Sequence, residues 1–155
     1  MPSQISSIFQ ALGAWEFTIK GDTIRAPFVN QIEDMPSSPS LPMRVISPAL
    51  NRAEGSLMGM TFGSTSLVVT WEIDDLMLWR PVAQAANFAK EAVPLMQYMV
   101  AYSEMWVANR QLTTQAFSEE IKNFSAGVFE YPAGSKVQFY GVLATHVIKE
   151  NIVNG

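Results

Sequence analysis

His146 is the single histidine of the chain, and cysteine is absent altogether. A metal site built from imidazole and thiolate ligands therefore cannot form within one copy, and no thiolate nucleophile is available. His146 comes near the end of an apolar stretch with the alternation of a strand, so we interpret it as a partly buried or edge histidine. We expect no bound metal ion, no cofactor and no enzymatic activity.

Two pairs of adjacent carboxylates, Glu33–Asp34 and Asp74–Asp75, are the remaining candidates for a Mg²⁺ or Ca²⁺ site. Neighbouring residues on a strand point to opposite faces of the sheet, so Asp74 and Asp75 should not converge on one ion. Glu119 and Glu120 are expected on a solvated helix face. The carboxylates therefore do not predict a metal site.

Serine chemistry has no local signature in this sequence. Gly55-Ser-Leu-Met-Gly59 lacks the glycine spacing of a nucleophile elbow and has no strand before it, and no glycine-rich phosphate loop occurs. A Ser-His-Asp constellation whose members meet only in space stays open, but no serine is favoured over another.

The charge content indicates a chain whose surface is covered by other subunits. Charged residues make up 15% of the sequence, whereas soluble domains average about 25%. Interface cores are poor in charge and rich in Met and aromatic residues, and the chain has nine Met, nine Phe and four Trp. A tightly packed monomer with a Ser, Thr, Asn and Gln surface is the alternative reading.

The net charge of -4 and the scattered Lys and Arg residues argue against a nucleic-acid binder, which needs a basic stripe. The apolar, charge-free stretch Ala92–Tyr102 is far short of the roughly 20 residues of a membrane-spanning helix. The first residues also lack the pattern of a signal peptide. We expect a soluble protein that does not associate with membranes.

In the first half of the chain, the spacing of apolar residues predicts a helix over Gln4–Leu12, with Ser3 as its N-cap. A strand over Trp15–Ile19, a proline-rich loop over Asp34–Pro42 and a strand over Met43–Ser47 follow. The segment Ala49–Gly63 reads as a long loop, either folded back on its own domain or projecting as an arm that docks on a partner. The candidate docking residues of this loop are Leu57, Met58, Met60 and Phe62.

The second half begins with an alternating strand from Leu67 that continues to Pro81. Helical spacing from Val82 to Arg110 predicts two helices separated at Pro94. The longer one is apolar nearly all round, which is typical of a buried helix and in a small domain points to a subunit interface. The candidate interface residues are Trp79, Arg80, Met96, Val100 and Val107.

Gln115–Phe124 can form a short piece of helix, and a hairpin closes the chain with strands over Gly127–Tyr131 and Lys136–Ile148. The elements together predict one domain over residues 1–155. Its fold class is α+β, with a mixed, mainly antiparallel sheet packed against two or three helices.

The order of these elements resembles the tail-terminator and neck proteins of tailed bacteriophages, in particular the gene-product-U-like tail terminators. The residues that carry the resemblance are Leu41-Pro-Met-Arg-Val-Ile46, Thr70-Trp-Glu-Ile-Asp74, Trp79-Arg-Pro81 and the final strand Phe139–Val147. These motifs are short, and the resemblance covers most of the chain as a pattern of elements.

The resemblance implies a virion protein, assembled in the host cytoplasm, that forms a homohexameric ring on the end of the tail tube. Its implied partners are further copies of itself, the tail tube protein and a head-tail connector, adaptor or sheath protein, with DNA only as passing cargo. It implies no catalytic residues. Another connector, tail-completion or baseplate protein, or a small-ligand-binding α+β domain, are the alternatives.

Overall fold

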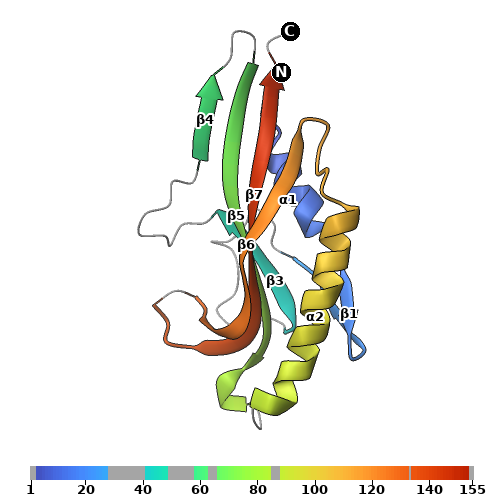
Figure 1. The fold of residues 1–155 in the computed structure, drawn as a ribbon. Helices are drawn as coiled ribbons and strands as arrows, with labels where there is room; N and C mark the ends of the chain where they lie inside the picture. Colours follow the sequence, from blue (N-terminus) through green and yellow to red (C-terminus); the bar gives the residue numbers. More distant parts are fainter. Residues whose placement is uncertain are drawn as a thin grey trace.

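The computed structural model describes residues 3–27, 41–48, 58–62, 66–84, 88–132 and 134–153. Helix α1 (Ile5–Gly13) precedes the short strands β1 (Phe17–Ile19) and β2 (Asp22–Ile24). The remaining elements follow in the order β3 (Met43–Pro48), β4 (Met58–Phe62), β5 (Ser66–Pro81), a 3-10 turn η2 (Val82–Gln84), α2 (Phe88–Ala108), β6 (Ala116–Glu130) and β7 (Gln138–Val153). Figure 1 shows long strands with both helices beside them, which confirms the α+β class.

The main sheet is antiparallel throughout, with β5 and β7 at its centre and β6 beside β7. Because β7 occupies one edge of β5 along its whole length, β3 and β4 share the other edge. Strand β3 pairs with the carboxyl-terminal half of β5, and β4 pairs with its amino-terminal end. The alternation of apolar and polar residues from Leu67 to Asp74 correctly predicts this central strand.

One face of the sheet is covered by α1, α2 and the β1–β2 hairpin. The turn of that hairpin holds Lys20 at φ 50° and Gly21 at φ 83°, the left-handed conformation that a two-residue hairpin turn requires. The buried core between the layers combines aliphatic and aromatic side chains from all these elements: Ile8, Leu12, Phe17, Ile73, Met77, Trp79, Leu95, Tyr98, Tyr102, Val142 and Ile148. A smaller cluster of Met43, Val45, Leu78 and Phe139 lies on the other face.

The close contact of β5 and β7 near the bulge at Leu78–Arg80 requires a glycine. A Cβ atom on Gly141 would lie 2.1 Å from the backbone oxygen of Met77. Glycine is the residue that permits such an approach between two backbones.

Two predictions about helices are wrong. Residues from Ala116 form strand β6 instead of a helix, and its register shifts twice, between Ser118 and Glu120 and between Lys122 and Ser125. These bulges interrupt the alternation and place apolar residues at spacings of three and four, which imitates a helix. Pro94 also does not divide α2, which is continuous through it, because its ring is buried on the core side with Leu95.

The predicted loop over Ala49–Gly63 is wrong where the structure describes it, because Met58–Phe62 form strand β4. Leu57, Glu33 and most of the proline-rich segment Asp34–Pro42 lie outside the described residues. Within the described part of the chain, no helix is long and apolar enough to cross a membrane.

Candidate functional site

The outward side of α2 is an unusual surface for a water-exposed helix. Val93 is half exposed, and Met96, Val100 and Val107 are 62%, 61% and 69% exposed. Their spacings of three, four and seven residues place them in one line along the helix, as in the seam of a coiled coil. We call Val93, Met96, Val100 and Val107 the α2 stripe.

The opposite side of α2 faces the core, with Leu95, Tyr98 and Tyr102 fully buried. The interface prediction for this helix stays a prediction, because the single chain buries only the core face of α2. Its apolar residues divide into a core face and the α2 stripe, and a shallow hollow of about 460 Å³ follows the stripe between Val93 and Glu104. A helix apolar on both faces is typical of an element that lies between two packed surfaces.

The other two predicted interface residues, Trp79 and Arg80, do not belong to the α2 stripe. Trp79 is only 2% exposed, and its indole N–H donates to Glu91 at 2.6 Å, so it is a core residue and the interface prediction for it is wrong. Arg80 is exposed, with its guanidinium over the Trp79 ring at 5.1 Å and near Glu91. The local sequence Trp79-Arg-Pro81 at the end of a strand does not distinguish a tryptophan buried in the core from one exposed at a subunit interface.

Of the predicted docking residues, Met58, Met60 and Phe62 lie on β4, paired with Trp71, Val69 and Leu67 of β5. They therefore belong to a strand at the edge of the sheet. Strand β6 lies at the opposite edge, so the sheet presents different strands on its two sides.

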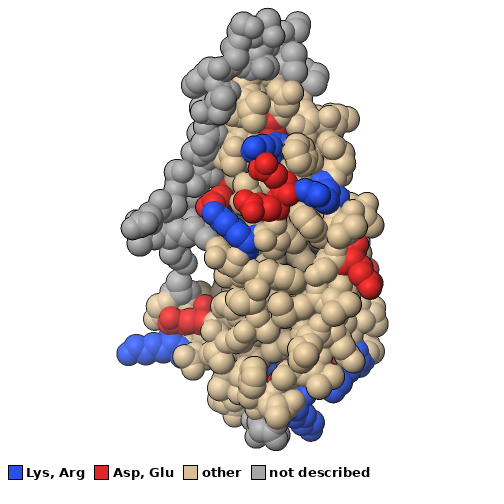
Figure 2. All heavy atoms as spheres, in the orientation of Figure 1, with Lys and Arg blue, Asp and Glu red and all other residues tan. Residues whose placement is uncertain are grey.

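Charged side chains are unevenly distributed on the face that Figure 2 shows. Acidic and basic residues gather in its upper part, and further charged residues lie along its margins around a broad area without charge. Ion pairs join Lys122 to Glu72 and Lys149 to Glu119 on the sheet.

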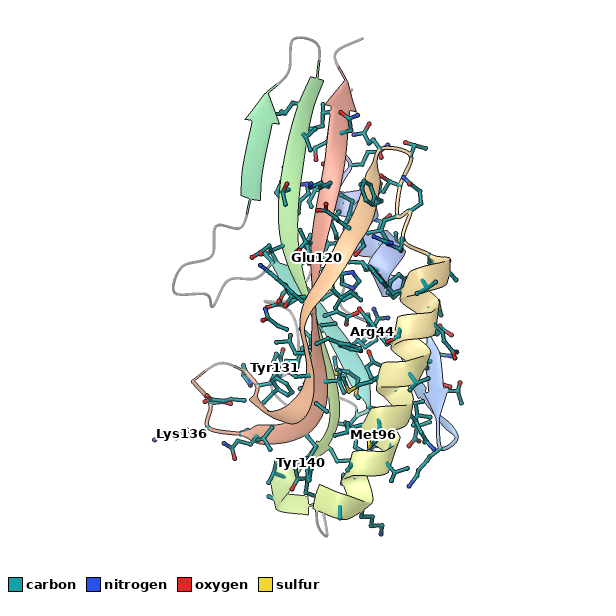
Figure 3. The ribbon with its side chains drawn as sticks, in the orientation of Figure 1. Arg44, Met96, Glu120, Tyr131, Lys136 and Tyr140 are labelled. Carbon is teal, nitrogen blue, oxygen red and sulfur yellow. The ribbon has the colours of Figure 1, made fainter. Side chains whose placement is uncertain are left out.

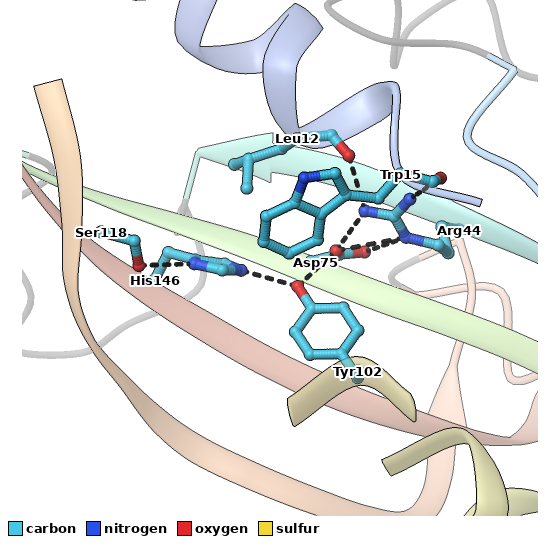
Figure 4. A network of polar contacts seen from close by, with 7 residues as sticks. All are labelled: Leu12, Trp15, Arg44, Asp75, Tyr102, Ser118 and His146. Atoms are coloured by element: carbon cyan, nitrogen blue, oxygen red, sulfur yellow. Dashed lines mark hydrogen bonds and ion pairs between the residues drawn. The ribbon is translucent and has the colours of Figure 1, made fainter. Parts of the chain in front are cut away.

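Beneath α2 lies the second candidate, a buried polar network centred on Arg44 and Asp75 (Figure 4). Arg44 Nη2 lies 2.6 Å from Asp75 Oδ2, and both side chains have no exposed surface. Arg44 also donates to the carbonyl oxygens of Leu12 at 2.9 Å and Trp15 at 2.6 Å. The Leu12 carbonyl is in the last turn of α1, where a cation is favourable because the helix dipole is negative there.

The network continues from Asp75 to His146 and Ser118. Tyr102 Oη donates to Asp75 Oδ2 at 2.6 Å and lies 2.6 Å from His146 Nε2. Ser118 Oγ is 2.8 Å from His146 Nδ1 and accepts from the Trp106 indole N–H at 2.8 Å. His146 is completely buried, so the prediction of a partly buried or edge histidine is wrong about its degree of burial.

The Asp75 end of this chain of hydrogen bonds fixes the proton on His146 Nε2. The Asp75 carboxylate can only accept, so the Tyr102 proton points to it and Tyr102 Oη accepts from His146 Nε2–H. In a neutral ring with its proton on Nε2, His146 Nδ1 accepts the proton of the Ser118 hydroxyl, which itself accepts from the Trp106 indole N–H.

The surroundings of His146 agree with a neutral ring. Burial lowers the pKa of His146 to about 4, Asp75 acts to raise it, and the Arg44 charge acts to lower it. Burial also acts to lower the pKa of Arg44, but Asp75 raises it above its ordinary value. Burial raises the pKa of Tyr102 well above 10, and the Asp75 charge adds to this effect.

A Ser118–His146 contact backed by Tyr102 and Asp75 has the outline of an activated serine, but all four side chains are at most 1% exposed. A general base must reach the proton of a bound substrate, and no substrate reaches these atoms. The network instead connects α1, β3, β5, α2, β7 and β6 through one set of satisfied polar groups. Such a network fixes one arrangement of the core.

The sequence carried a partial signal for this network. Arg44 and Asp75 each occupy inward positions of apolar strands, and a charge in such a position needs a buried partner. Asp75 does point inward while Asp74 contacts Thr145 on the other face, as the alternation predicts. The partnership of Arg44, Asp75, Tyr102 and Ser118 was missed, because their separation along the chain gives no spacing to recognise.

A third polar centre holds the start of α1. Ser3 is not the N-cap, because its hydroxyl donates to Glu150 Oε1 at 2.8 Å, and Glu150 Oε2 accepts the backbone N–H of Gln4. Burial acts to raise the pKa of Glu150, but hydrogen bonds from Gln4, Gln115, Ser3 and Trp71 lower it. The Glu150 carboxylate of β7 thus replaces a capping side chain at the start of α1.

Among the described residues no group of three or more His, Asp or Glu side chains is placed to hold a metal ion. The comparisons with known proteins do not extend these observations: neither a family model, nor a curated protein, nor a solved structure matches the chain.

Proposed function

We propose that this chain is a structural subunit that assembles with copies of itself into a ring. The observation that carries the proposal is the α2 stripe, whose three most exposed side chains are all apolar and lie in one line. Exposed apolar surface of this kind marks an interaction site in a soluble protein. A ring subunit contacts one neighbour on each side, which also fits a surface with little charge.

In its most specific form, the ring is the phage neck ring that ends the tail tube and joins the tail to the head. This form is supported by the resemblance of the motifs around Leu41–Ile46, Thr70–Asp74 and Phe139–Val147. Partners along the ring axis would be the tail tube protein on one side and a head-tail connector or sheath protein on the other. The buried network gives each subunit one rigid shape, which repeated contacts in a closed ring need.

The assembly is tested by light scattering and negative-stain imaging of the purified chain at low and high salt. We expect closed rings for the wild type and none for Val100→Asp, whose new charge would be buried without a partner. Thr18→Asp, an exposed position on β1, is the matched control and should assemble as the wild type does. Both variants should keep the melting temperature of the monomeric fold.

A chain that stays monomeric at all salt concentrations, and also when tail tubes are added, would contradict the proposal. The phage role has its own test in the genome, where the gene should lie beside genes for capsid, portal and tail tube proteins. Different neighbours would remove the phage role while leaving the ring to be judged by imaging.

A small-ligand-binding domain is the second candidate function, favoured by one hollow of about 580 Å³. It is lined by Val68, Gln111, Thr114, Gln115, Phe117, Lys149 and Asn151. Its mixture of one aromatic ring, one cation and amide groups is typical of a site for a small molecule. A monomer whose melting temperature rises with an added small molecule, and not in Phe117→Asp, would support this function over assembly.

A further inference from the structure

Strand β6 lies at the edge of the main sheet. It pairs with β7 along one side, and no other strand of the described part of the chain pairs with its second side. In Figure 3 the strand runs from Glu120, high on the sheet, toward Tyr131 near the curled end of the hairpin. The outward backbone N–H and C=O groups of a sheet edge are a template for a further strand.

The chain itself covers the first part of this edge. Ser118 N–H donates to the Arg110 carbonyl oxygen at 2.8 Å. The Arg110 guanidinium donates in turn to the carbonyl oxygens of Ser118, at 3.0 Å, and of Glu119. The register shifts that follow end at Ser125, and Asn123 within them has a φ of 56°. Bulges and charged side chains are common means by which proteins keep a sheet edge from pairing.

The last part of the edge lacks these features. We call Ser125–Tyr131 the open β6 edge. Its register with β7 is continuous, and Glu130 is its one charged residue. The Glu130 carboxylate accepts the backbone N–H of Lys136 at 2.6 Å, so it is held by the turn of its own hairpin. Pro132 ends the stretch, because proline has no N–H to donate to a neighbouring strand.

The register with β7 decides which backbone groups point outward. Tyr131 N–H donates to the Val137 carbonyl oxygen at 3.0 Å, so these two residues form a hydrogen-bonded pair. In an antiparallel ladder such pairs alternate with pairs that exchange no hydrogen bond. The N–H and C=O groups of Ala126, Val128 and Glu130 therefore point away from β7, toward the second side of β6.

The open β6 edge is symmetric about its middle residue, Val128, which is 48% exposed. A second copy of this edge, laid antiparallel, overlaps it completely only when the two Val128 residues are opposite each other. Each outward N–H then meets an outward C=O, because Ala126 is opposite Glu130. A shift in one direction brings Pro132 into the pairing, and a shift in the other brings in the bulge before Ser125.

The side chains also fit in this register. Val128 is opposite Val128, and β-branched residues paired across two strands stabilise a sheet. On the other face Phe129 is opposite Gly127, where a Cβ atom would meet nothing within 4 Å, so the space for the ring is open. An aromatic ring beside an edge glycine is a favourable cross-strand pair. Glu130 is opposite Ala126, so no like charges meet.

We infer that the open β6 edge pairs with the same edge of a second copy, antiparallel and about a two-fold axis at Val128. The contact joins the two sheets into one continuous sheet. It uses no residue of the α2 stripe, so it goes beyond the proposed ring and connects copies that the stripe does not. A single short strand pair is a small interface, and we expect a dissociation constant of about 100 µM. At low micromolar concentration the edge is therefore unpaired.

Cysteine cross-linking tests both the pairing and its register, because the chain has no cysteine of its own. Val128→Cys, Ala126→Cys and Val137→Cys are each made in the Val100→Asp background, so that rings do not contribute. The proteins are oxidised with diamide at several hundred micromolar. Opposite Cα atoms in such a pair are about 5.5 Å apart, a separation that a disulfide spans. Val128→Cys should therefore form a covalent dimer at least tenfold faster than the other two variants.

The other two variants are the controls. In the inferred register the two Ala126→Cys positions are about 13 Å apart along the strands, too far for a disulfide. Val137 is 46% exposed, nearly as much as Val128, but lies on the other side of the hairpin. Labelling with a maleimide dye at low concentration verifies that all three thiols are accessible, and equal melting temperatures verify that the fold is kept.

Sedimentation gives a second measurement without any cross-link. The Val100→Asp parent should show a concentration-dependent dimer, and Val128→Asp added to it should weaken that dimer at least tenfold, because two carboxylates would be opposite each other. Val137→Asp, which adds the same charge outside the open β6 edge, should leave the dimer unchanged. Equal weakening by both aspartates would contradict a contact centred on Val128.

The outcomes separate this inference from the proposed function. If Val128→Cys cross-links no faster than Val137→Cys, the edge does not pair and the inference is overturned. If Ala126→Cys cross-links fastest, the two copies meet in another register, and the inferred contact is wrong. Neither result affects the ring, which is judged in the chain that keeps Val100. A chain that forms no rings but cross-links through Val128→Cys loses the proposed function and keeps this contact.

Discussion

Acid should destabilise this protein through His146, and the size of the effect can be worked out from the buried network. The ring is neutral in the folded protein, and burial lowers its pKa to about 4, compared with 6.5 for an exposed histidine. Between these two values the unfolded chain binds a proton that the folded chain does not. Stability is therefore complete above pH 6.5 and falls as the pH decreases toward 4.

The difference of 2.5 between the two pKa values corresponds to about 3 kcal/mol over the whole range. Between about pH 7.5 and about pH 5, where most carboxylates are still ionised, the expected loss is about 2 kcal/mol. Protonating His146 would also place a positive charge near Arg44, whose guanidinium is already paired with Asp75. Burial is the main reason that the ring stays neutral, because of the two charged groups that act on it Asp75 favours protonation and Arg44 opposes it.

The assay is urea unfolding followed by tryptophan fluorescence at several pH values in this range, for the wild type and for His146→Gln. Both are studied in the Val100→Asp background, so that assembly does not make stability depend on concentration. The variant should be less stable at every pH, but its stability should change with pH by about 2 kcal/mol less than that of the parent. Equal pH dependence of the two proteins would refute the neutral, buried histidine.

Two further changes test how tightly the core is determined. Asp75→Asn should reduce the free energy of unfolding by about 3–5 kcal/mol in urea unfolding, because it leaves the Arg44 charge buried without its partner; a loss below about 1 kcal/mol would mean that water or another acceptor compensates. Gly141→Ala should lower the melting temperature strongly, because its Cβ would meet the Met77 carbonyl oxygen, whereas Gly127→Ala has open space around it and serves as the control. Equal effects of the two alanines would contradict the close approach of β5 and β7.

Several elements follow from local pattern alone. The alternation in β5 and β7 and the spacing of apolar residues in α1 are statements about neighbours in the chain, and the structure confirms both. The same reasoning failed at β6, where two bulges change the spacing, and at Pro94, where burial of the ring outweighs its cost to the helix. Bulges and burial depend on what lies across the sheet or beneath the helix.

The features of the candidate sites likewise divide into those that the local sequence predicts and those that only the packing of the elements decides. The sequence by itself determined that the chain has one histidine, little charge and a helix with more apolar residues than one core face needs. Only the tertiary structure decided that Met96, Val100 and Val107 face outward while Trp79 is buried, and that Arg44, Asp75, Tyr102 and His146 meet. The physical reason is that periodicity assigns a residue to a face of its own element. Which faces are covered, and which distant polar groups satisfy one another, is fixed when the elements pack.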